Sequence, residues 1–240
     1  MNDLKYLFAY TVPLAAFVSV LSTGILTFTA PLYTFLLIPI LELLLRKMES
    51  RQELRSSDSR LKNLFFDLLL YLNIPFVFFI LGYGLFVLAT ANLLTYEYVG
   101  ITLSLGILLA TNAINVAHEL GHRESLFERS LSKLLLLPCL YMHFYLEHNF
   151  GHHKNVATPL APATAKLNQP VYHFWLTSVS QQYINAWKIQ LGLLKKHNKG
   201  FLSAKNDMLF YLLFQALYLF TIVVLLGWNA LFFAVCIVIM

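Results

Sequence analysis

Long apolar runs that carry almost no charge are the feature that most restricts the fold of this chain. Residues 64–91 contain one charged side chain, Asp67. Further apolar runs cover residues 5–26, 29–45, about 99–117 and 207–226. The first two, split by Thr27 to Ala30 and by Pro31, predict a helical hairpin. A helix needs about 20 apolar residues to cross a bilayer, where every backbone polar group must be satisfied within the segment. The runs therefore predict an all-α membrane protein.

The composition excludes the soluble classes of protein. Hydrophobic residues make up 58% of the chain and charged residues 12%, whereas soluble proteins carry about 25% charged residues. The net charge of +5 comes mostly from two stretches rich in Lys and Arg, so it indicates membrane topology and anionic lipid headgroups. Membrane lipids are therefore expected partners, and nucleic acid is not.

The cationic stretches also predict an orientation. The positive-inside rule places residues 46–62 in the cytoplasm. The link over residues 92–98 carries Glu97 and no cation, as an outer turn should. The fourth run ends directly at His118, so the histidines emerge on the cytoplasmic side. A bacterial inner membrane, with the N-terminus in the cytoplasm, is the expected location.

A turn is expected at Gly227, and the last apolar run after it, residues 228–240, is too short to cross a bilayer. We therefore expect a single domain over residues 1–240, a bundle of about six transmembrane helices whose last helix is incomplete, and a C-terminal truncation. Residues 131–146 are interrupted by Pro138 and predict a re-entrant or interfacial helix. Residues 171–194 predict an amphipathic helix at the membrane surface.

Six of the eight histidines lie in one segment, residues 118–153. His118 and His122 are four residues apart, so they share one face of a helix. A second cluster follows the H-x-x-x-H-H pattern and comprises His148, His152 and His153. These five imidazoles are too many for one catalytic zinc, which uses about three protein ligands. The count favours two metal ions, although imidazole alone does not identify the metal.

Two strings around these histidines, NAINVAHELGHR and YLEHNFGHHKNVATP, resemble the first two histidine boxes of the integral-membrane alkane 1-monooxygenases. These enzymes are relatives of the membrane fatty-acid desaturases. The similarity extends to LIPILELL in the second run and to AKNDML near Asp207. It therefore covers most of the chain.

The resemblance implies a non-haem di-iron centre with dioxygen as co-substrate. The implied reaction is the terminal hydroxylation of medium- or long-chain alkanes to 1-alkanols, with electrons from rubredoxin and its reductase. The implied iron ligands are His118, His122, His148, His152 and His153. Three residues are expected to support these ligands by hydrogen bonding: Glu119, His143 and Glu147.

The chain departs from this family in two respects. Members carry a further E-H segment and a final H-x-x-H-H box after the sixth span, and this chain ends before both. Five ligands cannot complete the coordination of two irons. Acidic residues usual in the family are replaced here by Leu160 and Ala161.

Several alternatives remain open. A lipid desaturase or a fatty-acid or sterol hydroxylase would share the fold and the metals. The string H-E-x-x-H also fits an intramembrane zinc metalloprotease, and an inactive truncated paralogue would lack the final box. The other polar candidates have ordinary explanations: His173 and His197 as surface residues, Glu42 and Asp67 as helix ends, and Cys139 and Cys236 as buried apolar positions.

Overall fold

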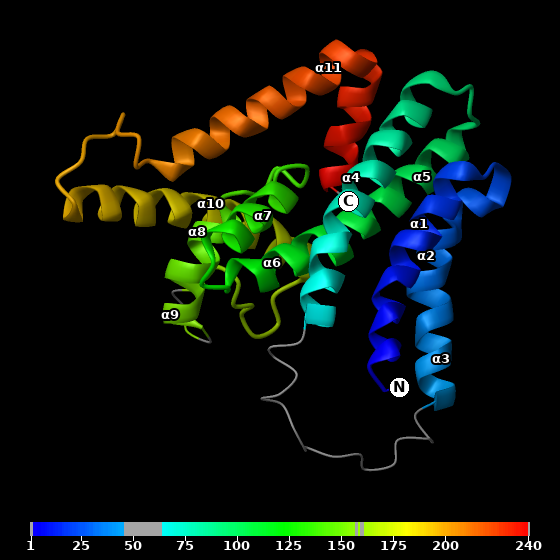
Figure 1. The fold of residues 1–240 in the computed structure, drawn as a ribbon, viewed down its shortest axis with the longest axis horizontal. Coiled ribbons are helices and arrows are strands. Elements are labelled where there is room, and N and C mark those ends of the chain that lie inside the picture. Colours follow the sequence, from blue (N-terminus) through cyan, green and yellow to red (C-terminus); the bar gives the residue numbers. More distant parts are fainter. Residues whose placement is uncertain (1, 46–63, 157, 159–160, 240) are drawn as a thin grey trace. The chain divides into compact units, whose positions relative to one another are not determined.

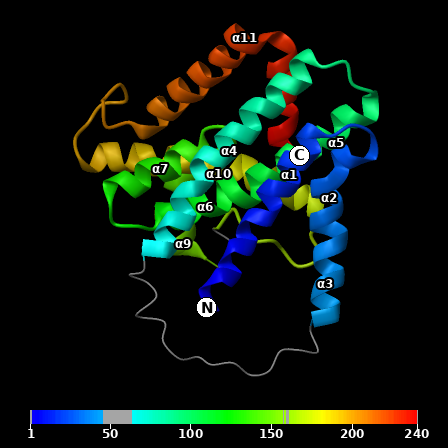
Figure 2. The same cartoon turned by 45° about the vertical axis from the view of Figure 1, so that its right-hand side comes forward.

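A computed structural model describes residues 2–45, 64–156, 158 and 161–239. These residues form helices and loops, with no strand among them (Figures 1 and 2). The cationic stretch 46–62 lies outside the described residues. The elements are η1 (Asn2–Tyr10), α1 (Thr11–Leu21), η2 (Gly24–Phe28), α2 (Thr29–Leu32), η3 (Tyr33–Leu37), α3 (Ile38–Leu45), α4 (Leu64–Thr90), α5 (Thr95–Leu108), η5 (Leu109–Ile114), α6 (Asn115–Gly121), α7 (Leu126–Leu136), α8 (Phe144–Glu147), η6 (His148–His152), α9 (His153–Asn155), α10 (Val171–Lys196) and α11 (Asp207–Ile239).

The described residues include 4 helical stretches that are long and apolar enough to cross a membrane: Gly24–Leu44, Leu64–Thr90, Thr95–Gly121 and Asp207–Ile239. A shorter apolar stretch covers Lys5–Leu21. The predicted all-α membrane class is therefore confirmed, whereas the number of spans and their sidedness remain predictions. The predicted turn at Gly227 interrupts α11, where the φ of this glycine is 83°.

The first two apolar runs form the expected pair of helices, but the predicted position of the turn between them is wrong. The sequence placed the break at residues 27–30, before Pro31. In the structure the chain is extended at Ser22 and Thr23, and Gly24 follows with a φ of 66°. Pro31 instead lies in the short helix α2, because a proline is tolerated in the first turn, where its missing N–H is not needed.

The chain divides into two compact units, Met1–Val116 with Thr221–Met240, and Ala117–Phe220. In the first unit α5 contacts α1, α2 and α4. The buried Glu97 carboxylate accepts hydrogen bonds from the backbone N–H groups of Gly24 and Leu94. This carboxylate therefore joins two connections of the helix bundle. A single domain over the whole chain stays a prediction.

The second unit contains the histidines and the two interrupted or amphipathic segments. The run 131–146 does not form one helix: α7 ends at Leu136, a turn with Leu140 at φ 50° follows, and α8 begins at Phe144. The amphipathic stretch forms α10, which contacts α8 and η6. Every fourth residue of α10 is buried: Ser178, Gln182, Ala186, Gln190 and Leu194.

Candidate metal centre

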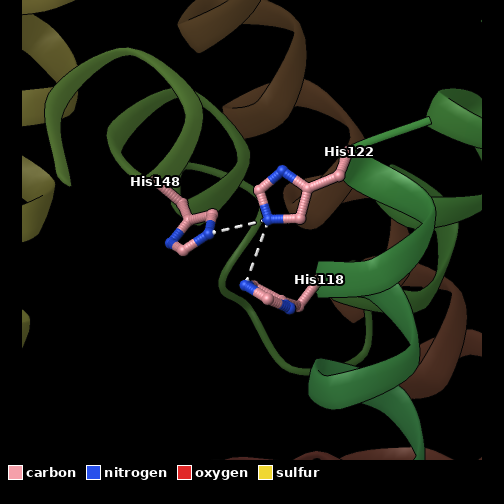
Figure 3. A group of neighbouring side chains, drawn as sticks. All are labelled: His118, His122 and His148. Carbon is pink, nitrogen blue, oxygen red and sulfur yellow. Dashed lines mark hydrogen bonds between the residues drawn. The ribbon is translucent and has the colours of Figure 1, made fainter. Parts of the chain in front are cut away.

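Two segments of the second unit bring the histidine boxes together. His118 lies in α6, and His122 follows its last residue. The other box begins at the π-helical turn η6 with His148 and ends with His153 at the start of α9. Figure 3 shows three of these side chains, His118, His122 and His148, turned toward one another.

Four Nε2 atoms form a continuous series of close contacts. The Nε2 atom of His122 lies 3.2 Å from that of His118 and 3.1 Å from that of His148. The Nε2 atom of His153 lies 3.0 Å from that of His148. In the group of His118, His122 and His148, the possible ligand atoms all lie within 4.8 Å of one another. The structure therefore brings the two boxes together through these four residues.

Hydrogen bonding alone does not satisfy this arrangement. Each Nε2 of a neutral imidazole offers either one proton or one lone pair. His122 and His148 each make two of the contacts, so neither of their Nε2 atoms can satisfy both of its contacts by hydrogen bonding. Nitrogens about 2.0–2.1 Å from a common metal, at angles of about 90–110°, lie about 2.9–3.4 Å apart. The Nε2 separations match this range, so the residues fit a metal ion held among them.

The π-helical backbone decides which histidines of the second box meet. In η6 the N–H of His153 donates to the carbonyl of His148, an i→i+5 bond. This wider turn places residues five apart on one side, whereas an α-helix would align residues four apart. The Nε2 of His148 therefore contacts His153 rather than His152.

His152 lies at the edge of the cluster. Its ring is stacked on that of His148, with 5.4 Å between centroids, and lies 6.0 Å from the ring of His153. Its Nδ1 is buried and has no hydrogen-bond partner in the described part of the chain. His152 therefore has an uncommitted nitrogen, and its role as a ligand stays a prediction.

Burial keeps one histidine of the second box, His148, in the neutral form that binds metals. Removal of the His148 ring from water, together with the neighbouring His118 and His153, lowers the pKa of His148 to about 3. The imidazole is therefore neutral at physiological pH. A neutral ring is the form that binds metals, so no proton has to be displaced from this residue.

Glu147 is the one predicted supporting residue that is fully buried beside the box. Its Oε1 accepts a hydrogen bond of 3.2 Å from Nδ2 of Asn185 on α10. Burial raises the pKa of Glu147, and Asn185 and the nearby His152 oppose that shift. Asn185 was not among the predicted site residues, because no periodicity or motif in α10 marks it.

Gly151 allows α10 to approach the second box closely. A Cβ atom there would lie 2.9 Å from Nδ2 of Asn185, 2.9 Å from Cδ1 of Ile189 and 3.1 Å from Oε1 of Glu147. The glycine therefore leaves the space that the Glu147–Asn185 hydrogen bond occupies. The G in the string E-H-N-F-G-H-H has a packing role that the sequence pattern alone does not reveal.

The other two predicted supporting residues do not join the cluster in this structure. Glu119 is exposed, and its carboxylate pairs with Arg123 at 3.2 Å. His143 is buried, and its ring lies against the rings of Tyr141 and Tyr183, with centroids 4.7 Å and 5.0 Å away. Their support of the ligands stays a prediction.

The remaining candidates lie elsewhere. His173 and His197 are exposed, in agreement with the expectation that they are surface residues. Glu42 and Asp67 belong to the first unit, so a hydrogen bond from either to an imidazole stays a prediction. Leu160 lies outside the described residues, and Ala161 is buried.

Comparison with known proteins places these histidines within a matched segment. Residues 94–240 match the fatty acid desaturase family. The chain is 34% identical over 145 residues to alkane 1-monooxygenase 1 of Alcanivorax borkumensis, covering 60% of this chain and 36% of that protein. It is 33% identical over 148 residues to alkane 1-monooxygenase of Pseudomonas putida, covering 62% and 37%. A relative from Acinetobacter baylyi with the same name is 40% identical over 97 residues, covering 40% and 24%. The matched part thus spans little more than a third of the length of the first two relatives and about a quarter of the third.

Proposed function

We propose that this chain, which belongs to the fatty acid desaturase family, is the part of an alkane 1-monooxygenase that carries the first two histidine boxes. The reaction would insert one oxygen atom of dioxygen into a terminal C–H bond of a medium- or long-chain alkane. The other oxygen atom would leave as water, with two electrons and two protons supplied. The names of the relatives from three genera support this assignment.

The convergence of four imidazole Nε2 atoms is the observation that carries the proposal. The group of His118, His122 and His148, with ligand atoms within 4.8 Å of one another, fits ligands of one ion. The neighbouring His153 and the uncommitted Nδ1 of His152 would then be available to a second. We infer a di-iron centre held by His118, His122, His148, His152 and His153, with further ligands supplied from beyond these boxes. Bound iron would supply the activation of dioxygen, and rubredoxin with its reductase would supply the electrons.

The protein itself contributes neutral, oriented ligands. Burial keeps His148 unprotonated, and the π-helical turn sets the angle between His148 and His153. The hydrogen bond between Glu147 and Asn185 holds this turn against α10. Such outer contacts fix the orientation of ligating rings and so raise the affinity of a site for its metal.

The zinc metalloprotease alternative is less well supported. It requires the glutamate of H-E-x-x-H as a free general base beside the metal. Here the Glu119 carboxylate is exposed and paired with Arg123. The active site of a zinc protease would also not require the contact between His148 and His153.

Metal content and product analysis test the proposal together. The purified full-length protein, supplied with rubredoxin, its reductase and an alkane, should bind iron and release a 1-alkanol. His148→Ala should lose metal and product, because it removes the Nε2 that joins the two boxes. His173→Ala, at an exposed position of α10, is the matched control and should retain both.

Each other outcome has a distinct meaning. A single bound zinc without alkanol would favour a protease. An alkene or a hydroxylated fatty acid or sterol as the product would favour the lipid desaturase or hydroxylase alternatives. Full activity of His148→Ala with its metal intact would contradict the ligand assignment, and absence of metal and product from the unaltered protein would indicate an inactive paralogue.

A further inference from the structure

A cavity of about 350 Å³ lies within the second unit, apart from the imidazole cluster. Its walls come from α7, α8 and η6, from the end of α10 and from the connection that leads to α11. Figure 1 labels α7, α8, α10 and α11. Pockets that bind small molecules commonly have volumes of about 300–1,000 Å³. The cavity is therefore large enough for a lipid headgroup.

The charged side chains that line the cavity are mostly cationic. The lining contains one carboxylate, Asp207, and four cationic side chains: Arg129, Lys133, Lys199 and Lys205. That carboxylate already pairs with Lys133, at 3.6 Å. Lys199 and Lys205 are exposed and make no ion pair in the described part of the chain. The cavity therefore keeps an excess of positive charge that its own residues do not neutralise.

Arg129 adds a directed donor to this charge. One of its terminal nitrogens donates to the carbonyl of Glu124, at 2.6 Å. Its Nε is buried and has no hydrogen-bond partner within the described residues. A buried guanidinium donor without a partner costs free energy, and the guanidinium of Arg129 belongs to a residue that lines the cavity. Arginine is well suited to phosphate because its donors are fixed in a plane.

The connection that carries the two free lysines is held in place by hydrogen bonds. Nε2 of Gln190 donates to the carbonyl of Lys205, at 2.9 Å, and the N–H of Lys199 donates to the carbonyl of Leu194, also at 2.9 Å. The buried Asn206 donates to the carbonyl of Phe201, at 2.8 Å. The backbone positions of both lysines are therefore fixed before any ligand binds, which lowers the entropic cost of binding.

Two observations indicate a lipid rather than a small soluble anion. Five apolar side chains share the cavity wall with the cations: Leu126, Leu146, Phe150, Leu193 and Leu194. In addition, Asp207 at the cavity is the first residue of a helix long and apolar enough to span a membrane. The end of such a helix lies at the depth of the headgroups, where basic pockets bind anionic lipids.

We propose that this cavity binds one anionic phospholipid, whose phosphate contacts Arg129, Lys199 and Lys205 while its first acyl carbons lie against the apolar wall. The site requires membrane placement of α11 but does not depend on the proposed alkane chemistry. Neither a metal nor an alkane enters its test, so its failure would leave the proposed function untouched.

Native mass spectrometry of the detergent-purified full-length protein measures the binding. Titration with dioctanoyl phosphatidylglycerol should show one saturable lipid per chain, and dioctanoyl phosphatidylcholine, which has the same tails, should bind more weakly. The double variant Lys199→Gln/Lys205→Gln should weaken phosphatidylglycerol binding roughly tenfold, because each cation near an anionic headgroup contributes appreciably.

The matched control is Lys195→Gln/Lys196→Gln. It removes the same charge from the same stretch, at exposed positions in the last turn of α10 that do not line the cavity. Unchanged phosphatidylglycerol binding by this control supports the site. Equal weakening by both pairs would overturn it, because only the bulk charge would then matter. Displacement of the lipid by inorganic phosphate at equal concentration would assign the cavity to a soluble anion instead.

Discussion

At the scale of single residues, His143 shows how burial changes the chemistry of an imidazole outside the cluster. Its side chain is 7% exposed, lies between the rings of Tyr141 and Tyr183, and has an unpartnered Nε2 among the described residues. Burial lowers the pKa of His143 to about 4. The folded protein therefore holds this ring neutral at pH values where the unfolded chain, with a pKa of about 6.5, takes up a proton.

This difference predicts a loss of stability in acid. Above about pH 6.5 neither state is protonated at His143, so the residue has no effect. As the pH falls from about 6.5 toward 4, the unfolded state binds the proton first and is favoured. The full difference corresponds to about 3 kcal/mol. Thermal unfolding of the detergent-purified protein should therefore show a steeper decline between pH 6.5 and 4 than the His143→Phe variant.

The matched control for this measurement is His197→Phe. His197 is exposed, so its replacement should leave the pH dependence as it is in the unaltered protein. Parallel declines of the His143→Phe variant and the unaltered protein would show that His143 is protonated in the fold and that its burial is incomplete.

At the scale of elements, the sequence predicted the helices well and their irregularities poorly. Apolar run lengths predicted α4 and the end of the Thr95–Gly121 helix to within a few residues. The π-helical turns η5 and η6 were not predicted, because they leave no periodic signal of their own and depend on packing. The sequence placed His148, His152 and His153 in one box, but it did not reveal that the i→i+5 turn brings His153 to the Nε2 of His148.

The packing of η6 against α10 leads to a prediction for Gly151. A methyl group there would meet Asn185 and Ile189 at 2.9 Å, so Gly151→Ala should separate the two elements and disturb the hydrogen bond to Glu147. Overpacking of this kind costs about 1–3 kcal/mol. We expect a lower midpoint of thermal unfolding and weaker metal retention in a chelator titration.

Gly192→Ala is the control for this substitution. Gly192 lies in α10, and a Cβ there would have no atom within 4 Å. Alanine favours a helix by up to about 1 kcal/mol over glycine, so this variant should be as stable as the unaltered protein or slightly more stable. A Gly151→Ala variant with unchanged stability and metal retention would show that the tips of Asn185 and Ile189 simply move aside.

At the scale of the whole molecule, the Thr95–Gly121 helix relates the histidines to one face of the membrane. This helix has 27 residues and is about 40 Å long at 1.5 Å per residue, which exceeds the hydrocarbon thickness of about 30 Å. His118 lies in its last turn, and the link that contains Asn92 precedes its first residue. If the helix crosses the bilayer, Asn92 and the histidines lie on opposite sides.

Cysteine labelling with a membrane-impermeant maleimide tests this topology. Asn92→Cys, at an exposed position, should react from outside intact cells, whereas Lys199→Cys should react only after the membrane is opened, because the cationic segments are expected in the cytoplasm. The unaltered chain is the control. Burial raises the pKa of Cys139 to about 12, which leaves little reactive thiolate, and Cys236 lies within the apolar helix α11. Labelling of both variants from the same side would show that the Thr95–Gly121 helix does not cross. Labelling of Lys199→Cys from outside intact cells would remove the basis for a cytoplasmic metal centre.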